Sequence, residues 1–300
     1  MKPPVGGQAV IEGVMMQNGD RIAVAVRRPT DAEILVRDLP ARKRFVKIGR
    51  IPFLRGLFRL YDMMSLGFRA LNLSTELAFP EDEQLSKSGT FFTFLFAITV
   101  AVGGFVILPI YLTNNIGVLR LGNSVLFNLV EGCIRLLFFF AYLVVISRMK
   151  DIHRVFQYHG AEHKVVYTYE ADEALTVENA RPHTTLHPRC GTAFLMTVFV
   201  IAILIFSLAG NPALWIKILS RLLLLPVVAG VSYEVLRFTG RHYDRWWVRL
   251  LAQPGLWLQR LTTAEPTDDM LEVAIASLQR ALGVEAETPP APEPAEAITN

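Results

Sequence analysis

The chain has 300 residues, of which 52% are hydrophobic and 19% are charged, and its mean hydropathy is +0.36. This apolar content exceeds what the core of a soluble domain needs, and it argues against a purely cytosolic globular enzyme. The 30 basic and 27 acidic residues are spread along the chain rather than gathered in a basic block. Composition therefore gives no support for nucleic acid as a partner.

The two cysteines, Cys133 and Cys190, are too few for a disulfide framework, and they favour a reduced site that faces the cytoplasm. No apolar stretch follows Lys2. We therefore expect no cleavable signal peptide, and we expect the chain to enter the membrane through internal segments.

The N-terminal part reads as a small β-rich unit. Residues 22–26 and 33–37 are β-branched runs, and residues 29–31 form a turn between them. Residues 6–16 are apolar and punctuated by glycine, which indicates one further strand. Its Gln8 and Glu12 either approach a functional site or belong to an ordinary edge strand.

Residues 51–77 carry apolar side chains at helical spacing with arginines between them. Two interpretations of this amphipathic helix stay open. It either lies on the inner surface of the membrane, or packs as a soluble helix on the β-rich unit.

Four apolar segments follow, at residues 90–112, 123–147, 192–209 and 214–238. The first has 23 residues and no charge, which is enough to cross a hydrocarbon core of roughly 30 Å. Asn211 and Pro212 predict a tight turn that makes the last two segments an antiparallel hairpin.

Lysine and arginine collect before the first span, after the second and after the fourth, whereas the connection between the first two spans contains only Arg120. Basic residues in short loops are retained on the cytoplasmic side. The pattern predicts a multi-pass membrane protein with both termini and residues 149–191 in the cytoplasm.

The second span contains Glu131 and Arg135. A spacing of four places them on one helical face as an ion pair, because each charge alone is costly inside a bilayer. They are functional candidates, and a structural pair or an interfacial position for Glu131 explains them equally well.

Five of the six histidines lie between the second and third spans, and two of them, His159 and His163, are four residues apart with Glu162 in the same helical arc. This H-x-x-E-H spacing is the inverted zincin pattern, in which two histidines bind zinc and the glutamate polarises a metal-bound water. His187 and Cys190 add an imidazole and a thiolate just before the third span. The four ligands predict a site for Zn²⁺ or another divalent metal, although membrane-surface histidines also cap helices or contact lipid phosphate.

The ligand count decides what such a site does. Four protein ligands make a closed structural site, whereas a free position, with Glu162 as the base for a bound water, makes a catalytic one. The first hypothesis is a zinc-dependent hydrolase at the cytoplasmic membrane surface, in which the third ligand beside the two α-helical histidines is either His187 or Cys190. Its substrate is undetermined. The alternative is a non-enzymatic membrane regulator or adaptor with a structural metal and a protein partner on its cytoplasmic face. A transporter that uses Glu131 and Arg135 is a weaker third hypothesis. Four spans without repeats leave little room for a transport pathway unless the chain forms a homo-oligomer. Under all three hypotheses, membrane lipid is an expected partner.

Six motifs resemble the YqhQ-like bacterial membrane family, also called domain of unknown function 1385. They cover residues 7–16, 52–56, 147–152, 156–164, 186–192 and 254–259. The resemblance extends to about residue 283 and implies a predicted metal-dependent enzyme without an established substrate.

Taken together, these features predict a mainly α polytopic membrane protein with about four transmembrane helices, a small N-terminal β unit and a cytoplasmic His-rich loop. The expected segments are the β-rich unit (1–50), the amphipathic membrane-surface helix (51–88), the first transmembrane hairpin (89–148), the metal-site loop (149–191), the second hairpin (192–240), a cytoplasmic helical segment (241–283) and a disordered acidic, proline-rich tail (284–300).

Overall fold

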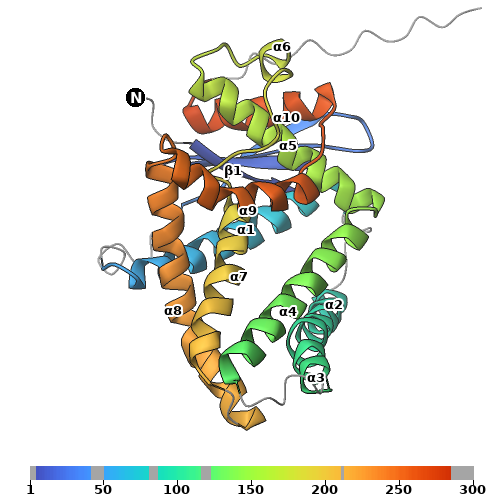
Figure 1. The fold of residues 1–300 in the computed structure, drawn as a ribbon. Helices are drawn as coiled ribbons and strands as arrows, with labels where there is room; N and C mark the ends of the chain where they lie inside the picture. Colours follow the sequence, from blue (N-terminus) through green and yellow to red (C-terminus); the bar gives the residue numbers. More distant parts are fainter. Residues whose placement is uncertain (1–4, 42–50, 81–86, 116–122, 211–212, 285–300) are drawn as a thin grey trace, which may run out of the picture.

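The computed structural model describes residues 5–41, 51–80, 87–115, 123–210 and 213–284. It has two parts, a unit built around a small β-sheet and a bundle of long helices beneath it (Figure 1). The predicted turn at residues 211–212 and all but the first residue of the predicted tail lie outside the described residues.

The sheet is an antiparallel meander in the order β1-β2-β3-β4, formed by β1 (Val5–Val10), β2 (Gly13–Asn18), β3 (Arg21–Arg27) and β4 (Ile34–Asp38). The prediction of a single strand over residues 6–16 is wrong, because the chain turns at Ile11 and Glu12 and pairs Val10 with Gly13. Two-residue hairpin turns favour positive φ, and Glu12 has φ of 52°.

Each face of the sheet is covered by helices. Helices α5 (Lys150–Glu170) and α10 (Asp268–Leu282) cover one face, and helix α1 (Leu54–Ala78) covers the other. Side chains alternate between two cores, as the pleat of a strand requires: Val14 and Met16 of β2 pack toward α5 and α10, whereas Met15 packs toward α1. One face of the sheet is therefore covered in part by α10, a helix from the C-terminal part of the chain.

Helix α1 agrees with the second of its two predicted placements, since Ala70 and Ala78 are buried in the core against the sheet. The helix also contacts α8. Its opposite side leaves large apolar side chains exposed, with Met64 68% and Phe68 57% accessible. One helix thus combines a packed face with an apolar free face.

Within the described part of the chain, four helices are long and apolar enough to cross a membrane, at Phe91–Asn115, Ser124–Ile146, Gly191–Leu208 and Trp215–Arg241. The first combines α2 (Lys87–Val102), a π-helical turn (Gly103–Ile107) and α3 (Leu108–Asn115). The others are α4 (Ser124–Ile146), α7 (Gly191–Leu208) and α8 (Leu214–Arg241). The predicted mainly helical fold with four apolar segments and a small N-terminal sheet is confirmed.

The segment predicted as a His-rich loop is mostly helical. Helix α5 occupies its first half, and the short α6 (Val177–Ala180) follows. Helix α9 (Trp246–Thr262) runs across the upper end of the bundle, beside α7 and below the sheet unit (Figure 1). The chain leading into α7 therefore meets α5 and α9 where the two parts of the molecule join.

Candidate metal centre

Three of the four predicted ligands come together at this junction. Their ligand atoms, from His159, His163 and Cys190, lie within 4.8 Å of one another, and His159 Nε2 is 3.1 Å from Cys190 Sγ. The spacing of four on α5 places both imidazoles on one face. Cys190 reaches them because it is the N-cap residue of α7, where its sulfur accepts a hydrogen bond from the Thr192 amide.

Backbone carbonyls fix the tautomers of the two α5 histidines. His159 Nδ1 donates to the carbonyl oxygen of Thr262 at 2.8 Å, and His163 Nδ1 donates to that of Thr185. Each ring therefore keeps a lone pair on Nε2. The buried His163 Nε2 makes no hydrogen bond within the described residues. Histidine ligands typically have this arrangement, with the second nitrogen anchored by a carbonyl, so the residues fit a divalent metal.

His187, the fourth predicted ligand, lies beside the cluster but is not among the three grouped ligands. Its Nδ1 accepts a hydrogen bond from the Arg189 amide at 3.3 Å, and its Nε2 lies 3.6 Å from Glu170 Oε2. Burial acts to raise the pKa of Glu170, but the contacts with His187 and Arg189 outweigh it and lower this pKa. The structure thus groups three of the predicted ligands, while His187 contacts the Glu170 carboxylate.

Glu162 is buried against the sheet, with 6% of its surface exposed, and its Oε2 lies 3.4 Å from His163 Nε2. Burial raises the pKa of Glu162, opposed by His159, by His187 and by a hydrogen bond from the Gly7 amide. A Cβ at position 7 would lie 2.6 Å from Glu162 Cγ. Strand β1 can approach this carboxylate because it has glycine there.

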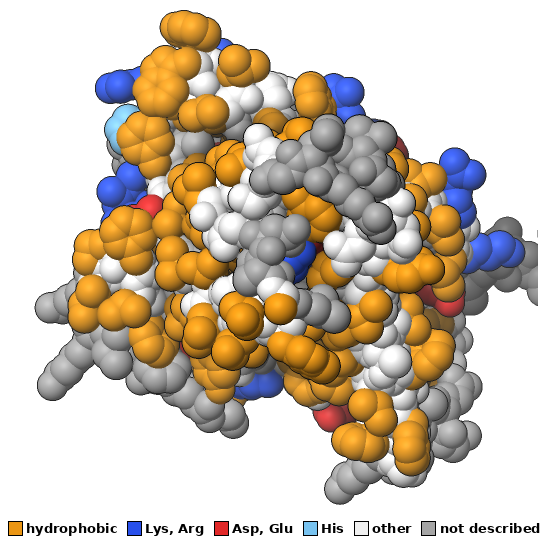
Figure 2. Space-filling model, turned by 60° about the horizontal axis from the view of Figure 1, so that its bottom comes forward, with side chains coloured by type: hydrophobic (Ala, Val, Ile, Leu, Met, Phe, Trp, Pro, Cys, Tyr) orange, Lys and Arg blue, Asp and Glu red, His pale blue; other side chains and the backbone are white. Residues whose placement is uncertain are grey.

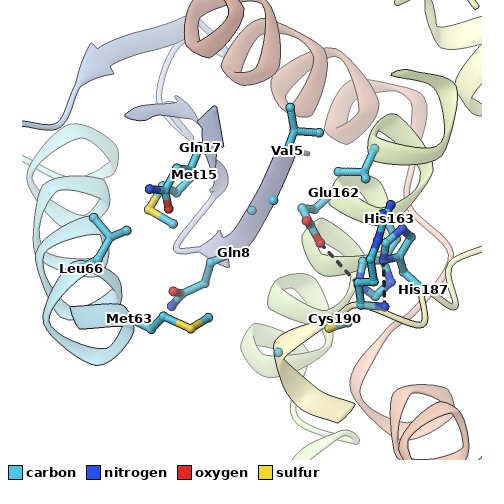
Figure 3. Close-up of a pocket in the computed structure, with 15 residues that line it drawn as sticks. Val5, Gln8, Met15, Gln17, Met63, Leu66, Glu162, His163, His187 and Cys190 are labelled. Carbon is cyan, nitrogen blue, oxygen red and sulfur yellow. Dashed lines mark hydrogen bonds and ion pairs between the residues drawn. The ribbon is translucent and has the colours of Figure 1, made fainter. Parts of the chain in front are cut away.

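A cavity of about 160 Å³ opens beside the cluster. Glu162, His163, His187 and Cys190 lie on its polar side, while Met63 and Leu66 of α1 form an apolar wall (Figure 3). Four groups with metal or proton chemistry therefore border a space that can hold a small molecule.

Gln8 and Glu12, the two N-terminal candidates, have different positions. Gln8 lines the cavity from β1 (Figure 3) and packs on Gly67 of α1. Glu12 does not line it, because its carboxylate accepts two hydrogen bonds from Arg154 near the start of α5. Strand β1 is an edge strand as well, so both predicted interpretations of residues 6–16 describe part of what is observed.

Glu131 and Arg135 form the predicted pair on α4, with 2.7 Å between Glu131 Oε1 and Arg135 Nη2. Glu131 lies 15 residues before the end of α4, or about 20 Å down the helix from the end that leads to α5. The pair is therefore no part of the metal centre.

Three contributors were not predicted. Gln259 of α9 is fully buried and holds the backbone of His187 at both its N–H and its C=O. A glutamine on the apolar face of an amphipathic helix is a signal that could have found it. The carbonyls of Thr185 and Thr262 leave no signal, because every residue has one.

A family model described as "Protein of unknown function (DUF1385)" matches residues 51–284. The chain is 37% identical over 301 residues to "Uncharacterized protein YqhQ" of Bacillus subtilis (strain 168), and the alignment covers 95% of this chain and 94% of that protein. No solved structure matches the chain.

Proposed function

This chain belongs to the DUF1385 family, and we propose that it is a zinc-dependent hydrolase acting at the cytoplasmic surface of the inner membrane. One observation carries the proposal. His163 Nε2 is buried and has no hydrogen-bond partner among the described residues, in a cluster with the His159 imidazole and the Cys190 sulfur. A buried nitrogen with a free lone pair is costly unless something binds it, and a divalent cation suits this donor set.

The two Nε2 atoms and the Cys190 thiolate would hold the ion. Three protein ligands and one open position are typical of catalytic zinc sites. A zinc ion bound there supplies a Lewis acid and lowers the pKa of a water molecule.

Glu162 is the proposed general base. It takes a proton from the attacking water at a carboxylate oxygen and later gives it to the leaving group. Its position on the wall of the cavity gives the carboxylate access to a bound molecule.

The cavity also restricts the substrate. Its apolar wall belongs to α1, whose free face exposes Met63, Met64 and Phe68. A substrate that combines a hydrolysable polar bond with an apolar portion matches both walls, and it can arrive along the membrane surface.

The regulator or adaptor hypothesis keeps one specific support. His187 Nε2 is a second buried nitrogen without a hydrogen bond in the described structure. A rotation of this ring from Glu170 toward the cluster would supply a fourth ligand and close the site.

Metal analysis tests the site. We expect near-stoichiometric zinc in the purified full-length protein and a sharp loss in His163→Ala. The control is His183→Ala, because His183 is in the same segment but contacts Glu173 instead. Equal metal content in His163→Ala and the wild type would refute the ligand assignment.

Two further variants separate the hydrolase from the adaptor. Glu162→Gln should keep metal and membrane abundance but lower the hydrolytic function about 10²-fold or more, measured by complementation of a deletion strain. His187→Gln should keep its metal if the site is open and lose it if His187 is the fourth ligand. Full complementation by Glu162→Gln, together with metal loss in His187→Gln, would favour the adaptor.

A further inference from the structure

The helix bundle buries a second charged cluster, at the end opposite the histidines. Its centre is Glu131, whose side chain is 1% exposed. Arg135 of the same helix and Arg221 of α8 both donate hydrogen bonds to the carboxylate. Lys217, one turn before Arg221, places its Nζ 3.9 Å from Glu131 Oε2.

The charges in this cluster do not balance. Among the described residues it contains three cations and one carboxylate, and the side chains of the three cations are between 5% and 15% exposed. Charged groups within a membrane-length apolar bundle are normally paired with opposite charge. The four side chains therefore have a formal excess of two positive charges.

Some of the donors have no acceptor in the described part of the chain. The Lys217 ammonium lies over the Phe127 ring at 4.3 Å, and its distance to Glu131 is too long for a hydrogen bond. Arg135 uses Nε for the Phe105 carbonyl and Nη2 for Glu131, which leaves Nη1. These donors can accept an additional ligand without breaking the existing pairs.

The cluster lies near the lower end of the molecule. Lys217 lies three residues after the first residue of α8, which is about 5 Å along the helix. Figure 2 shows Lys or Arg atoms at the base of a hollow on this face, with hydrophobic side chains around it. The described basic residues on the lower halves of the long helices are the three of this cluster.

We propose that Arg135, Lys217 and Arg221 bind one phosphate-type anion at the end of the bundle opposite the histidine cluster. Arginine presents planar paired donors and lysine a compact charge, and both are preferred ligands of phosphate oxygens. A dianion would balance the excess charge. The phosphate belongs either to a lipid headgroup or to a small soluble molecule, and the experiment has one arm for each source.

The lipid arm uses native mass spectrometry of the full-length protein. Phosphatidic acid is compared with phosphatidylcholine, whose phosphate is already balanced by a choline cation. We expect retained phosphatidic acid if the source is a lipid. The soluble arm measures binding of radiolabelled inorganic phosphate to protein in phosphatidylcholine nanodiscs, where we expect saturable binding if the source is a free anion.

The central variant is Lys217→Met, which removes the ammonium and keeps the bonds of Glu131 to both arginines. The affinity for the ligand that the wild-type protein binds, phosphatidic acid or inorganic phosphate, should fall about tenfold or more, since a hydrogen bond to a charged group is lost. Lys217→Arg should retain it. Lys150→Met, an exposed lysine at the start of α5, is the matched control and should bind like the wild type.

Two results would overturn the proposal. One is that wild-type protein prefers phosphatidic acid no more than phosphatidylcholine and also fails to bind inorganic phosphate. The other is that Lys217→Met and Lys150→Met bind equally. The wild-type comparison decides the question even if Lys217→Met does not fold, and zinc content is measured in parallel because this site is independent of the metal centre.

Discussion

The side chain of Gln259 connects α9 to the loop that supplies Cys190. It is fully buried, its Nε2 donates to the His187 carbonyl at 2.8 Å, and its Oε1 accepts from the His187 amide at 2.7 Å. Cys190 lies three residues after His187 in the chain. We therefore expect these two hydrogen bonds, which we call the Gln259 clamp, to fix the position of the Cys190 sulfur as well as that of His187.

Gln259→Leu keeps a similar volume and removes both hydrogen bonds. It leaves the buried His187 N–H unpaired, which costs about 1–3 kcal/mol, and it removes one of two hydrogen bonds of the His187 C=O, worth about 0.5–1.5 kcal/mol. The C=O keeps its bond from the Cys190 amide at 3.3 Å. The free energy of unfolding should therefore fall by about 1.5–4.5 kcal/mol, which corresponds to a decrease in Tm of at least about 3 °C for a chain of this size. Zinc content should fall together with Tm, because the loop is released.

Differential scanning fluorimetry of the full-length protein in nanodiscs, with metal analysis of the same samples, measures both effects. Gln157→Leu is the matched control, since Gln157 makes a single bond, from Nε2 to the Glu265 carbonyl at 3.1 Å. It should lose no more than about 1.5 kcal/mol. If Gln259→Leu has the Tm and zinc content of the wild type, the clamp does not position the loop and our reasoning is refuted.

Three further predictions concern the membrane topology and the close contacts around the site. A cysteine introduced at Asp172 should stay unlabelled by an impermeant thiol reagent in intact cells and react after lysis. Labelling in intact cells would show that this segment lies outside the cytoplasm and that the predicted topology is wrong. Gly160→Ala should lower stability by about 1–3 kcal/mol in thermal unfolding, because its Cβ would lie 2.1 Å from the Ala264 carbonyl oxygen. The control is Gly104→Ala, whose Cβ would meet no atom within 4 Å and should cause no loss of stability. Gly7→Ala should impair complementation at normal abundance, because its Cβ would displace Glu162, and Gly6→Ala, with open space around it, should complement fully.

The sequence predicted those parts of the fold that depend on local pattern. Uninterrupted apolar length predicted the four long helices, and β-branched runs predicted the strands at residues 22–26 and 33–37. The turn at Ile11 and Glu12 was missed because no proline, asparagine or Asn-Gly pair marks it. The contact between α10 and the sheet joins segments more than 200 residues apart, and periodicity within one segment contains no information on such pairing.

The sequence likewise predicted those parts of the site that depend on local spacing and missed those that depend on the folded chain. Spacing on one helix placed His159 and His163 together, and the short H-x-x-C motif added Cys190, so the three grouped ligands were all predicted. The orientation of His187 was not, because it depends on Glu170 and on the Arg189 amide in the folded chain. The same limit applies to the bundle, where a spacing of four predicted Arg135 as the partner of Glu131 but not Arg221, which is 90 residues away.

Helix α1 is fixed at one end to the bundle and along its length to the sheet. At its start, a Cβ on Gly56 would lie 2.7 Å from Tyr233 Cβ of α8, and Arg55 pairs with Glu234 of the same helix. Near its other end, Ser74 accepts a hydrogen bond from the Ile11 amide of the sheet unit. The residues between these two attachments form the apolar wall of the cavity. Bilayer thickness influences the tilt of a spanning helix. In the membrane arrangement that we propose, a change in the tilt of α8 would displace the start of α1, and the thickness of the bilayer would then influence the position of the apolar wall of the cavity.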